Sequence, residues 1–536
     1  MRRVNVIRGL VLFLCLASLT AGMGFRSLWP PDEQREAEIS REMAVGGSWL
    51  IPHLAGRPFV EKPPLYYWIS AFSMKALGSF AGLTISARAV SVLSILILLA
   101  LLWSVSRSIL GSTRAFNLLL VLASMVGIFD AAYKVLIDPI LLCLIGSSIL
   151  LLFIGLARRR PVLLLTGYLA AGLAFLAKGF IGWAIIGIPG IALGIIYYRE
   201  IIRRPLLHLI GVFLLFGPGL AWATVFYLRG NPELWRQWFF DNQIGRFLGR
   251  TAHLGHIKGP FYYGELLPLA LLPWTPAVLG WIIHRGWRDW RGEPAAAKNF
   301  FRVAVVWALG GIFFLSLAGT KRNVYLFPLL PAFAVLAAFY LERPAIWVKV
   351  INRVSAIVLI LGAAYLSLFR PVSSGEKFPW SWNPDIFALI CVLAGIYVFR
   401  AARKDSLLRL AGIAAVTYLV YQFTLLPVID QDKTYQPMVG QLRAAVPEGK
   451  LARVCGWDSD ERTRGSFAFY GEIYLRDVAD PIRLNRIIRG ADPEYSLILT
   501  REKYFPPPGS DLSTYRVLSR GEAEGRKYLL ISGGAE

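Results

Sequence analysis

Residues 29–70 read WPPDEQREAEISREMAVGGSWLIPHLAGRPFVEKPPLYYWIS, a long polar insert near the start of a very apolar chain. The insert opens with the acidic residues Asp32 and Glu33 and ends on Glu61, Lys62, two prolines and an aromatic cluster. Charges of both signs beside aromatic residues, directly after a hydrophobic segment, are typical of a site at a membrane surface. The sequence therefore predicts that the rest of the chain is a scaffold that holds this loop.

Composition indicates a membrane protein that crosses the bilayer many times. The chain has 536 residues, of which 56% are hydrophobic and 17% are charged, whereas a soluble domain carries about 45–50% and about 25%. The net charge of +23 comes from short basic clusters between apolar runs, as in cytoplasmic loops, so no nucleic-acid partner is expected. The four cysteines form no disulfide or CxxC framework.

The expected fold class is an α-helical polytopic membrane protein with thirteen spans. The first segment fits either a cleaved signal peptide or a transmembrane helix, and we favour the helix because the remainder needs an anchor in this orientation. The predicted spans are 6–25, 86–108, 115–132, 139–157, 161–178, 180–198, 206–228, 263–284, 302–318, 323–341, 350–369, 384–400 and 407–427.

The distribution of basic residues sets the sidedness. The segment 64–80 has only about ten uninterrupted apolar residues, which is short for a crossing. If it does not cross, the main basic clusters all face the cytoplasm, as the positive-inside rule requires. Residues 26–85 then form one outer loop with interfacial helices, within a transmembrane domain at 1–429. The charged segment 430–536, with strand-like runs, is predicted to be a small soluble α/β domain on the outer side.

Several basic residues fall on the outer side against this bias, which indicates an anionic ligand or, more simply, interfacial anchoring. Asp32 and Asp138 can be helix caps, or two carboxylates that act at one membrane face. Lys62 can form a surface ion pair with Glu61 or hold a phosphate. His253 and His256 are too isolated to indicate zinc. The exceptional cations are Lys134, Lys178, Arg246, Arg250, Lys258, Lys321 and Arg322.

These motifs resemble a known family. PDEQREAEISREM and GGSWLIPHLAGRPFVEKPPLYYW, then Asp138 with Pro139, GLAFLAKG, NQIGRFLGR and TKRNVYLFPLLP, are similar to the bacterial transferases that move 4-amino-4-deoxy-L-arabinose from undecaprenyl phosphate to lipid A. With the protein O-mannosyltransferases these belong to the membrane-embedded GT-C glycosyltransferases. The resemblance covers about residues 25–335 and specifies the family more than the sugar or the acceptor.

The resemblance implies thirteen spans, a soluble domain after the last, and roles for particular residues. One departure is Glu36, which stands where the aminoarabinose enzymes have tyrosine and leaves the identity of donor or acceptor open. The resemblance assigns Asp32, its neighbour Glu33 and Asp138 to catalysis, and Lys62, Lys178, Arg246 and Tyr325 to the cavity for the donor phosphate and sugar. Arg35 and Lys321 are also predicted to bind the donor phosphate or sugar.

The expected activity is an inverting transfer, on the periplasmic face of the bacterial inner membrane, by a monomer. The partners are an undecaprenyl-phosphate-linked sugar, lipid A or another envelope acceptor, and the bilayer. No cofactor is predicted, although a divalent metal stays open. Asp32 is a general base if the acceptor is a hydroxyl, and a sugar-positioning group if it is an ionised phosphate. The alternatives are a protein O-mannosyltransferase and, from another class, a lipid transporter or flippase.

Overall fold

The computed structural model describes residues 2–250, 257–283, 293–341, 383–400, 406–505 and 515–533, with single positions between 342 and 382. Seven helices in this described part are long and apolar enough to cross a membrane, or nine if each of two bent pairs is one span. The seven are α1 (Arg2–Thr20), α4 (Leu83–Leu110), α7 (Asp138–Ala157), α8 (Pro161–Lys178), α11 (Pro205–Arg229), the run of α16 (Ala295–Val305), η5 (Val306–Gly310) and α17 (Gly311–Leu317), and the run of η6 (Asn323–Leu329) and α18 (Leu330–Tyr340).

Two predicted spans are bent and two others are short. The pair α5 (Ser112–Ala123) and α6 (Val126–Ala132) is bent by 65°. The pair α21 (Ser406–Phe423) and α22 (Leu425–Lys433) belongs to a helix run bent by 44°. The helices α9 (Phe180–Ile196) and α20 (Asn383–Arg400) contain shorter apolar stretches. The predicted span 350–369 lies outside the described residues except for four single positions, so the number thirteen stays a prediction.

The predicted span at 263–284 is not one continuous helix. The structure forms two short helices there, α14 (Tyr262–Ala270) and α15 (Thr275–Ile283). Pro268 lies inside the first helix and Pro273 lies between the two. A proline has no N–H group and its ring clashes with the preceding helical turn, which explains why one straight helix does not form.

The centre of the bundle is α7, which is buried along nearly its whole length. Lipid is as apolar as a helix surface, so helices in membranes associate through close packing at small residues. Gly155 provides such a contact with α8, because a Cβ atom there would lie 2.7 Å from the backbone nitrogen of Leu164. Gly172 of α8 does the same with α11, where a Cβ would lie 2.3 Å from the carbonyl oxygen of Leu214.

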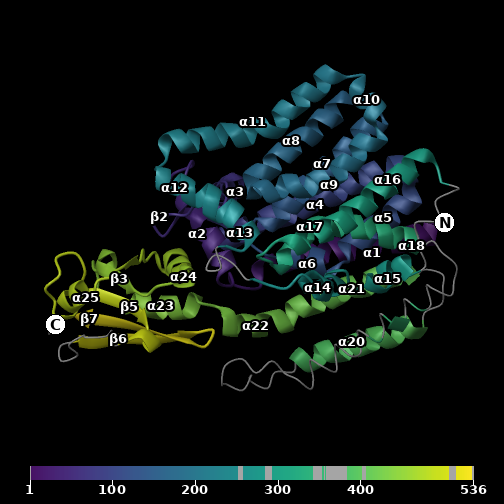
Figure 1. Cartoon of the computed structure of the whole chain (residues 1–536). Coiled ribbons are helices and arrows are strands. Elements are labelled where there is room, and N and C mark those ends of the chain that lie inside the picture. The colour runs from purple at the N-terminus through teal and green to yellow at the C-terminus, as the bar shows by residue number, and fades with distance from the viewer. Residues whose placement is uncertain are drawn as a thin grey trace.

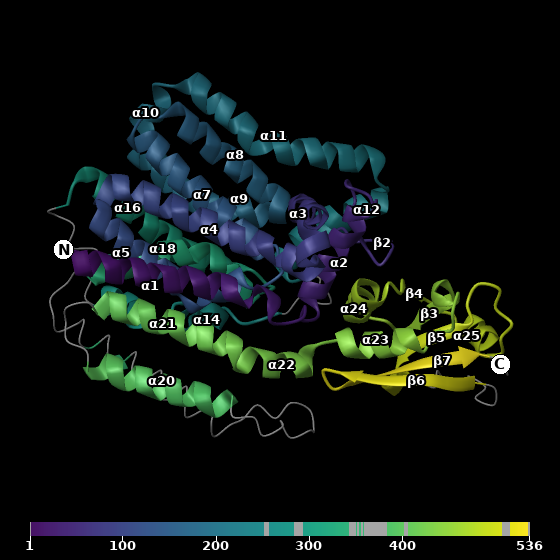
Figure 2. The same ribbon diagram turned by 180° about the vertical axis from the view of Figure 1, so that it is seen from behind.

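The polar insert folds at one end of this bundle. It forms α2 (Asp32–Ala44), the hairpin of β1 (His53–Leu54) and β2 (Arg57–Pro58), and α3 (Leu65–Ala81). Figures 1 and 2 both show these elements at the end of the bundle nearest the C-terminal sheet, with α12 (Pro232–Arg236) beside them. The helix α3 is not among the helices long and apolar enough to span. Shorter elements are η1 (Ala21–Gly24), α10 (Tyr198–Ile202), η2 (Gln237–Gly245) and α13 (Arg246–Leu248).

The chain after α22 forms the C-terminal unit, which we define as α23 to β7. Its five-stranded sheet has the order β4-β3-β5-β7-β6, in which β3 pairs in parallel with β4 and β5 and the other pairs are antiparallel. Apolar clusters cover both faces of the sheet. The elements are α23 (Gln436–Ala444), β3 (Val454–Trp457), α24 (Glu461–Gly471), β4 (Arg476–Asp477), α25 (Pro481–Ile488), β5 (Leu497–Arg501), β6 (Tyr515–Ala523) and β7 (Arg526–Gly533), with the short helices η7 (Leu451–Arg453) and η8 (Glu502–Tyr504).

Candidate active site

The helix α2 is unusual because it is highly charged and yet almost completely buried. It begins at Asp32, directly after two prolines, and the carboxylates of Asp32 and Glu33 in its first turn are favourable beside the positive end of the helix dipole. Buried charges are tolerated only when they are paired and hydrogen-bonded. The partners of each charge on α2 therefore indicate what it does.

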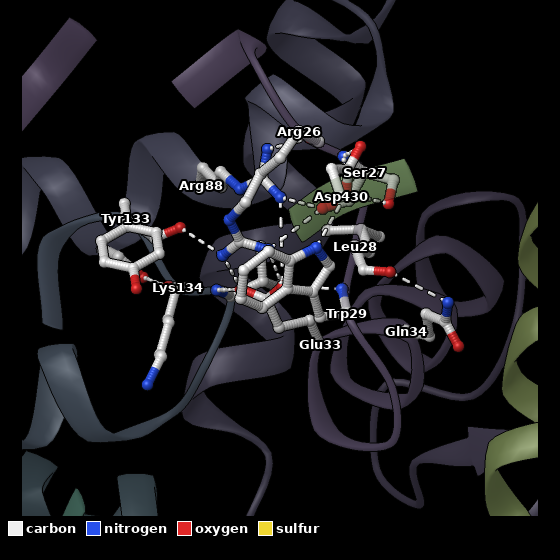
Figure 3. A network of polar contacts seen from close by, with 12 residues as sticks. Arg26, Ser27, Leu28, Trp29, Glu33, Gln34, Arg88, Tyr133, Lys134 and Asp430 are labelled. Carbon is white, nitrogen blue, oxygen red and sulfur yellow. Dashed lines mark hydrogen bonds and ion pairs between the residues drawn. The ribbon is translucent and has the colours of Figure 1, made fainter. Parts of the chain in front are cut away.

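Glu33 anchors α2 to the transmembrane helices (Figure 3). Its carboxylate forms a two-pronged ion pair with Arg26, in which Arg26 Nη2 donates to Glu33 Oε1 at 2.6 Å. The backbone N–H groups of Trp29 and Val135 also donate to it, each at 2.8 Å. Burial alone would raise the pKa of Glu33, but Arg26 and Arg88 outweigh it and hold the pKa below its usual range. Both carboxylate oxygens of Glu33 accept hydrogen bonds from within the protein. These contacts favour a role in holding α2 against the transmembrane helices over the catalytic role that the resemblance implies.

Asp32 lies between two guanidinium groups. Arg35 Nη2 donates to Asp32 Oδ1 at 2.9 Å, and Arg322 Nη2 donates to Asp32 Oδ2. Burial alone would raise the pKa of this carboxyl, but Arg35, Arg322 and Lys62 outweigh it and keep the pKa well below its usual range. Asp32 is therefore ionised at neutral pH and is a weak proton acceptor.

A cavity of about 380 Å³ lies beside this helix. Its charged and aromatic wall contains four of the residues predicted to bind the donor, Lys62, Lys178, Arg246 and Tyr325, together with Glu61. The rest of the wall is mostly apolar. It comprises Phe180, Ile181, Ala184, Ile244, Phe247, Leu248, Phe314, Leu315 and Ala318, with Asn242, Gln243 and Thr320 as its neutral polar members.

Two of the cations in the cavity wall have a close carboxylate partner. Arg246 Nη2 lies 2.7 Å from Glu61 Oε1, and the Lys178 ammonium is hydrogen-bonded to Asp138. Lys178 also lies over the ring of Tyr325, 4.5 Å from its centre. Burial alone would raise the pKa of Glu61, but its cationic neighbours lower it to about 2.

Lys62 and Arg35 connect the cavity to Asp32. Lys62 Nζ lies 3.6 Å from Glu61 Oε2 and 3.8 Å from Glu36 Oε1. Arg35 Nη2 donates to the same Glu36 oxygen at 3.0 Å and to Asp32 at 2.9 Å. Asp138 therefore contacts a residue of the cavity wall directly, whereas Asp32 is connected to the wall through Arg35 and Glu36.

Glu36, at the position where the resemblance implies tyrosine, is not a free carboxylate. Tyr67 donates its hydroxyl hydrogen to Glu36 Oε2 at 2.6 Å, and Arg35 binds the other oxygen. Only 2% of the Glu36 residue surface is exposed. Its charge balances Arg35 and Lys62.

Lys321 and Arg322 show how the structure distinguishes two adjacent cations. Arg322 has extended backbone angles, φ −138° and ψ 146°, and successive side chains along extended backbone point in opposite directions. Lys321 donates to the carbonyl oxygens of Lys258, at 3.1 Å, and Ala318, whereas Arg322 binds Asp32. The assignment of Lys321 to donor binding stays a prediction that these contacts do not favour, and Arg322 takes the position beside Asp32.

Asn242 is a site residue that the sequence-based prediction missed. It lies on η2, a nine-residue stretch of π-helix, a conformation that is rare and often found at functional sites. Asn242 lines the cavity, is 6% exposed and donates its amide to the Gln237 carbonyl oxygen at 3.0 Å. Among the described residues its side-chain oxygen has no hydrogen-bond partner. A ligand hydroxyl or ammonium group is a suitable partner.

The described residues contain no group of three or more His, Cys, Asp or Glu side chains that could hold a metal ion. His253 and His256 lie outside the described residues. The expectation that no cofactor is needed therefore stays a prediction.

Comparisons with known proteins agree with the resemblance. Residues 61–222 match the family model described as dolichyl-phosphate-mannose-protein mannosyltransferase. A relative from Sodalis glossinidius (strain morsitans), undecaprenyl phosphate-alpha-4-amino-4-deoxy-L-arabinose arabinosyl transferase 1, is 32% identical over 419 residues, which cover 74% of this chain and 71% of the relative. Arabinosyl transferase 2 of Proteus mirabilis (strain HI4320) is 29% identical over 398 residues, 71% of this chain and 68% of the relative.

The fold has a solved counterpart. The crystal structure of ArnT from Cupriavidus metallidurans bound to undecaprenyl phosphate matches with a TM-score of 0.77 at 20% identity, over 97% of each chain. The fold is therefore that of the membrane-embedded GT-C glycosyltransferases. Together with the identity to the Sodalis enzyme over most of both chains, this means that the protein belongs to the family of undecaprenyl phosphate-aminoarabinose arabinosyl transferases.

Proposed function

We propose that this protein moves 4-amino-4-deoxy-L-arabinose from undecaprenyl phosphate to lipid A on the periplasmic face of the inner membrane. The observation that carries the proposal is the placement of Lys62, Lys178 and Arg246 in the wall of one cavity whose remaining lining is mostly apolar. A polyprenyl phosphate has an anionic headgroup on a long hydrocarbon chain. The cations suit the headgroup, and the aromatic and aliphatic wall suits the first isoprene units.

The reaction that fits this site is a direct displacement at the anomeric carbon. An oxygen of the acceptor forms the new glycosidic bond while the bond to the donor phosphate breaks, and its electron pair leaves with undecaprenyl phosphate. Negative charge then accumulates on the leaving phosphate, and Lys62, Lys178 and Arg246 can stabilise it. A one-step displacement inverts the configuration at the anomeric carbon.

The low pKa of Asp32 favours a phosphate as the acceptor. A carboxylate held far below its usual pKa is a poor general base, because efficient bases have a pKa near the working pH. A phosphate of lipid A is already ionised and needs no base. Asp32 then takes no proton, and the negative charge of its carboxylate can stabilise positive charge on the ring of the donor sugar in the transition state.

A second candidate is a protein O-mannosyltransferase, which is favoured by the match of residues 61–222 to a mannosyltransferase family model. Its acceptor is a hydroxyl group, and it would require a base with a higher pKa than that of Asp32. The cationic surroundings of Asp32 therefore support the phosphate acceptor better. The described residues give no specific support for a transporter or flippase.

The topology that accompanies this function has thirteen spans, a transmembrane domain at 1–429 and a soluble domain at 430–536 in the periplasm. Support comes from the contact between the polar insert and the C-terminal unit, in which Arg35 of α2 binds Glu461 of α24 at 3.0 Å. Two segments in contact must lie on the same side of the membrane. A basic N-terminus in the cytoplasm and an odd number of spans put both outside.

A reconstituted reaction tests the function. The purified protein is incubated in detergent with a synthetic undecaprenyl-phosphate aminoarabinose donor and lipid A, and the products are analysed by mass spectrometry. Parallel reactions contain a polyprenyl-phosphate mannose donor with either lipid A or a serine-rich peptide. We expect modified lipid A in the aminoarabinose reaction alone. Transfer of mannose to the peptide, with unmodified lipid A, would replace the proposal with the second candidate.

A further inference from the structure

The C-terminal unit reaches the candidate active site through one ion pair. Arg35 presents both terminal nitrogens of its guanidinium to carboxylates: Nη2 to Asp32 and Glu36, and Nη1 to Glu461 Oε2 at 3.0 Å. The Arg35 side chain is 7% exposed, so its position is set by these partners. Glu461 is the first residue of α24 and is distant in the sequence from the other members of this cluster.

The contact around this ion pair is close and well defined. Gly465 of α24 lies against the backbone of α2, where an added Cβ would be 3.4 Å from the Cα of Arg35. Ser466 donates its hydroxyl hydrogen to the side-chain oxygen of Gln34. The Leu28 N–H group, just before α2, donates to the Tyr470 hydroxyl oxygen at 2.8 Å. The unit is therefore docked on the helix that carries Asp32.

From this geometry we propose that Glu461 is a positioning residue, through which the C-terminal unit sets the orientation of Arg35 and thereby of Asp32. The proposal rests on the proposed function, because Asp32 must act on the donor sugar for its orientation to matter. The connection runs from Glu461 to Arg35, to Asp32 and then to Arg322, the residue that precedes η6.

The exposure of the Glu461 side chain indicates that Glu461 contributes to the orientation of Arg35 more than to the stability of the fold. Its side chain is 40% exposed, and ion pairs of exposed groups add little to stability. Without Glu461, the Arg35 guanidinium keeps only its contacts with Asp32 and Glu36 through Nη2. It can then rotate and change the orientation of the Asp32 carboxylate that it binds. Small displacements of reacting groups lower turnover strongly, whereas the residues in the cavity wall keep their places. The effect should therefore fall on kcat and not on KM for the donor.

Three variants test the proposal in the reconstituted reaction. Glu461→Ala removes the partner of Arg35, and Glu461→Gln keeps an acceptor oxygen without the charge. Glu472→Ala is the matched control, because Glu472 pairs at 3.1 Å with Arg443 inside the same unit and is 64% exposed. We expect kcat to fall about three- to tenfold for Glu461→Ala and less for Glu461→Gln. KM for the donor, binding of undecaprenyl phosphate and Tm should match those of the control.

The outcomes separate this inference from the function on which it rests. If the unmodified protein transfers no sugar to lipid A, the proposed function fails. If it is active and Glu461→Ala has the same kcat as Glu472→Ala, the positioning role is wrong and the function stands. A fall in kcat that is accompanied by an equal loss of undecaprenyl phosphate binding or by a large drop in Tm would also overturn the positioning role. Glu461 would then act on ligand binding or on the stability of the fold.

Discussion

Glu61 is expected to weaken binding of the lipid phosphate, although it lies in the middle of the binding site. Its carboxylate forms an ion pair with Arg246 at 2.7 Å and lies 3.6 Å from the Lys62 ammonium. Arg246 and Lys62 are the two cations best placed to bind the phosphate. With a pKa near 2 it stays ionised over the physiological range. A phosphate that binds these cations must therefore approach a like charge. Glu61→Gln removes that charge and keeps the shape of the side chain.

The size of the effect follows from Coulomb's law. A phosphate on the far side of Arg246 would lie about 6 Å from the Glu61 carboxylate, and two like charges at that separation repel by about 0.7–2.8 kcal/mol for a dielectric constant between 80 and 20. This corresponds to about three- to hundredfold tighter binding in Glu61→Gln. The product carries more negative charge than the donor, so its release should slow and kcat should not rise.

Binding of undecaprenyl phosphate to the purified protein, followed by tryptophan fluorescence in detergent, measures this directly. Glu233→Gln is the control, because Glu233 pairs with Arg236 at 3.4 Å and both side chains are about two-thirds exposed. We expect a lower Kd for Glu61→Gln and an unchanged Kd for the control. Equal or weaker binding in a Glu61→Gln protein with near-native Tm would refute the reasoning, and would show that Glu61 serves mainly to hold Arg246 in place.

Other substitutions and conditions test separate parts of the account. Lys321→Met should lower stability by about 1–2 kcal/mol, since it removes hydrogen bonds to backbone carbonyls, and leave KM for the donor unchanged. Arg322→Gln should lower kcat about ten- to hundredfold, since Asp32 loses one of its two cations; reversed kinetic effects of these two variants would contradict the assignment. Glu33→Gln should destabilise the fold by about 3–5 kcal/mol because it leaves a buried guanidinium without its counter-charge, and an unchanged thermal melting curve would contradict the anchoring role. The depressed pKa values of Asp32 and Glu61 give stability that is complete above about pH 4.5 and is lost as pH falls towards 2; a loss of Tm between pH 5 and 3 that is as large in Glu61→Gln as in the unmodified protein would contradict this.

The sequence predicts the site best where a charged residue lies in an apolar helix or on the side of the membrane where few basic residues are expected. Lys178 at the end of an apolar helix and Arg246 on the outer side both stand out by this test, and both line the cavity. Lys62 was a candidate phosphate ligand from the sequence itself, whereas Tyr325 was assigned to donor binding through the family resemblance, and both line the cavity too. The helical scaffold is also predictable, because uninterrupted apolar runs of about 20 residues indicate transmembrane helices.

The choice between adjacent residues was not predictable, because it depends on backbone geometry. Lys321 and Arg322 look equivalent in the sequence. Because the backbone at Arg322 is extended, their side chains point in opposite directions, and Lys321 binds backbone carbonyl oxygens whereas Arg322 binds Asp32. Asp32 and Glu33 lie side by side at the start of α2, yet neighbours on a helix do not share a face. Glu461 lies outside the region of the resemblance, so only the folded chain connects it with Arg35.

The central claim is that Asp32 acts in sugar transfer to lipid A, and mass spectrometry of lipid A from cells tests it most directly. Lipid A is compared from cells without the protein, with the protein and with Asp32→Asn at equal membrane abundance. We expect a mass gain of one pentosamine with the protein, reduced about a hundredfold or more by Asp32→Asn. Lipid A that is unchanged by the protein would contradict the proposed acceptor, and full modification by Asp32→Asn would contradict the role of Asp32.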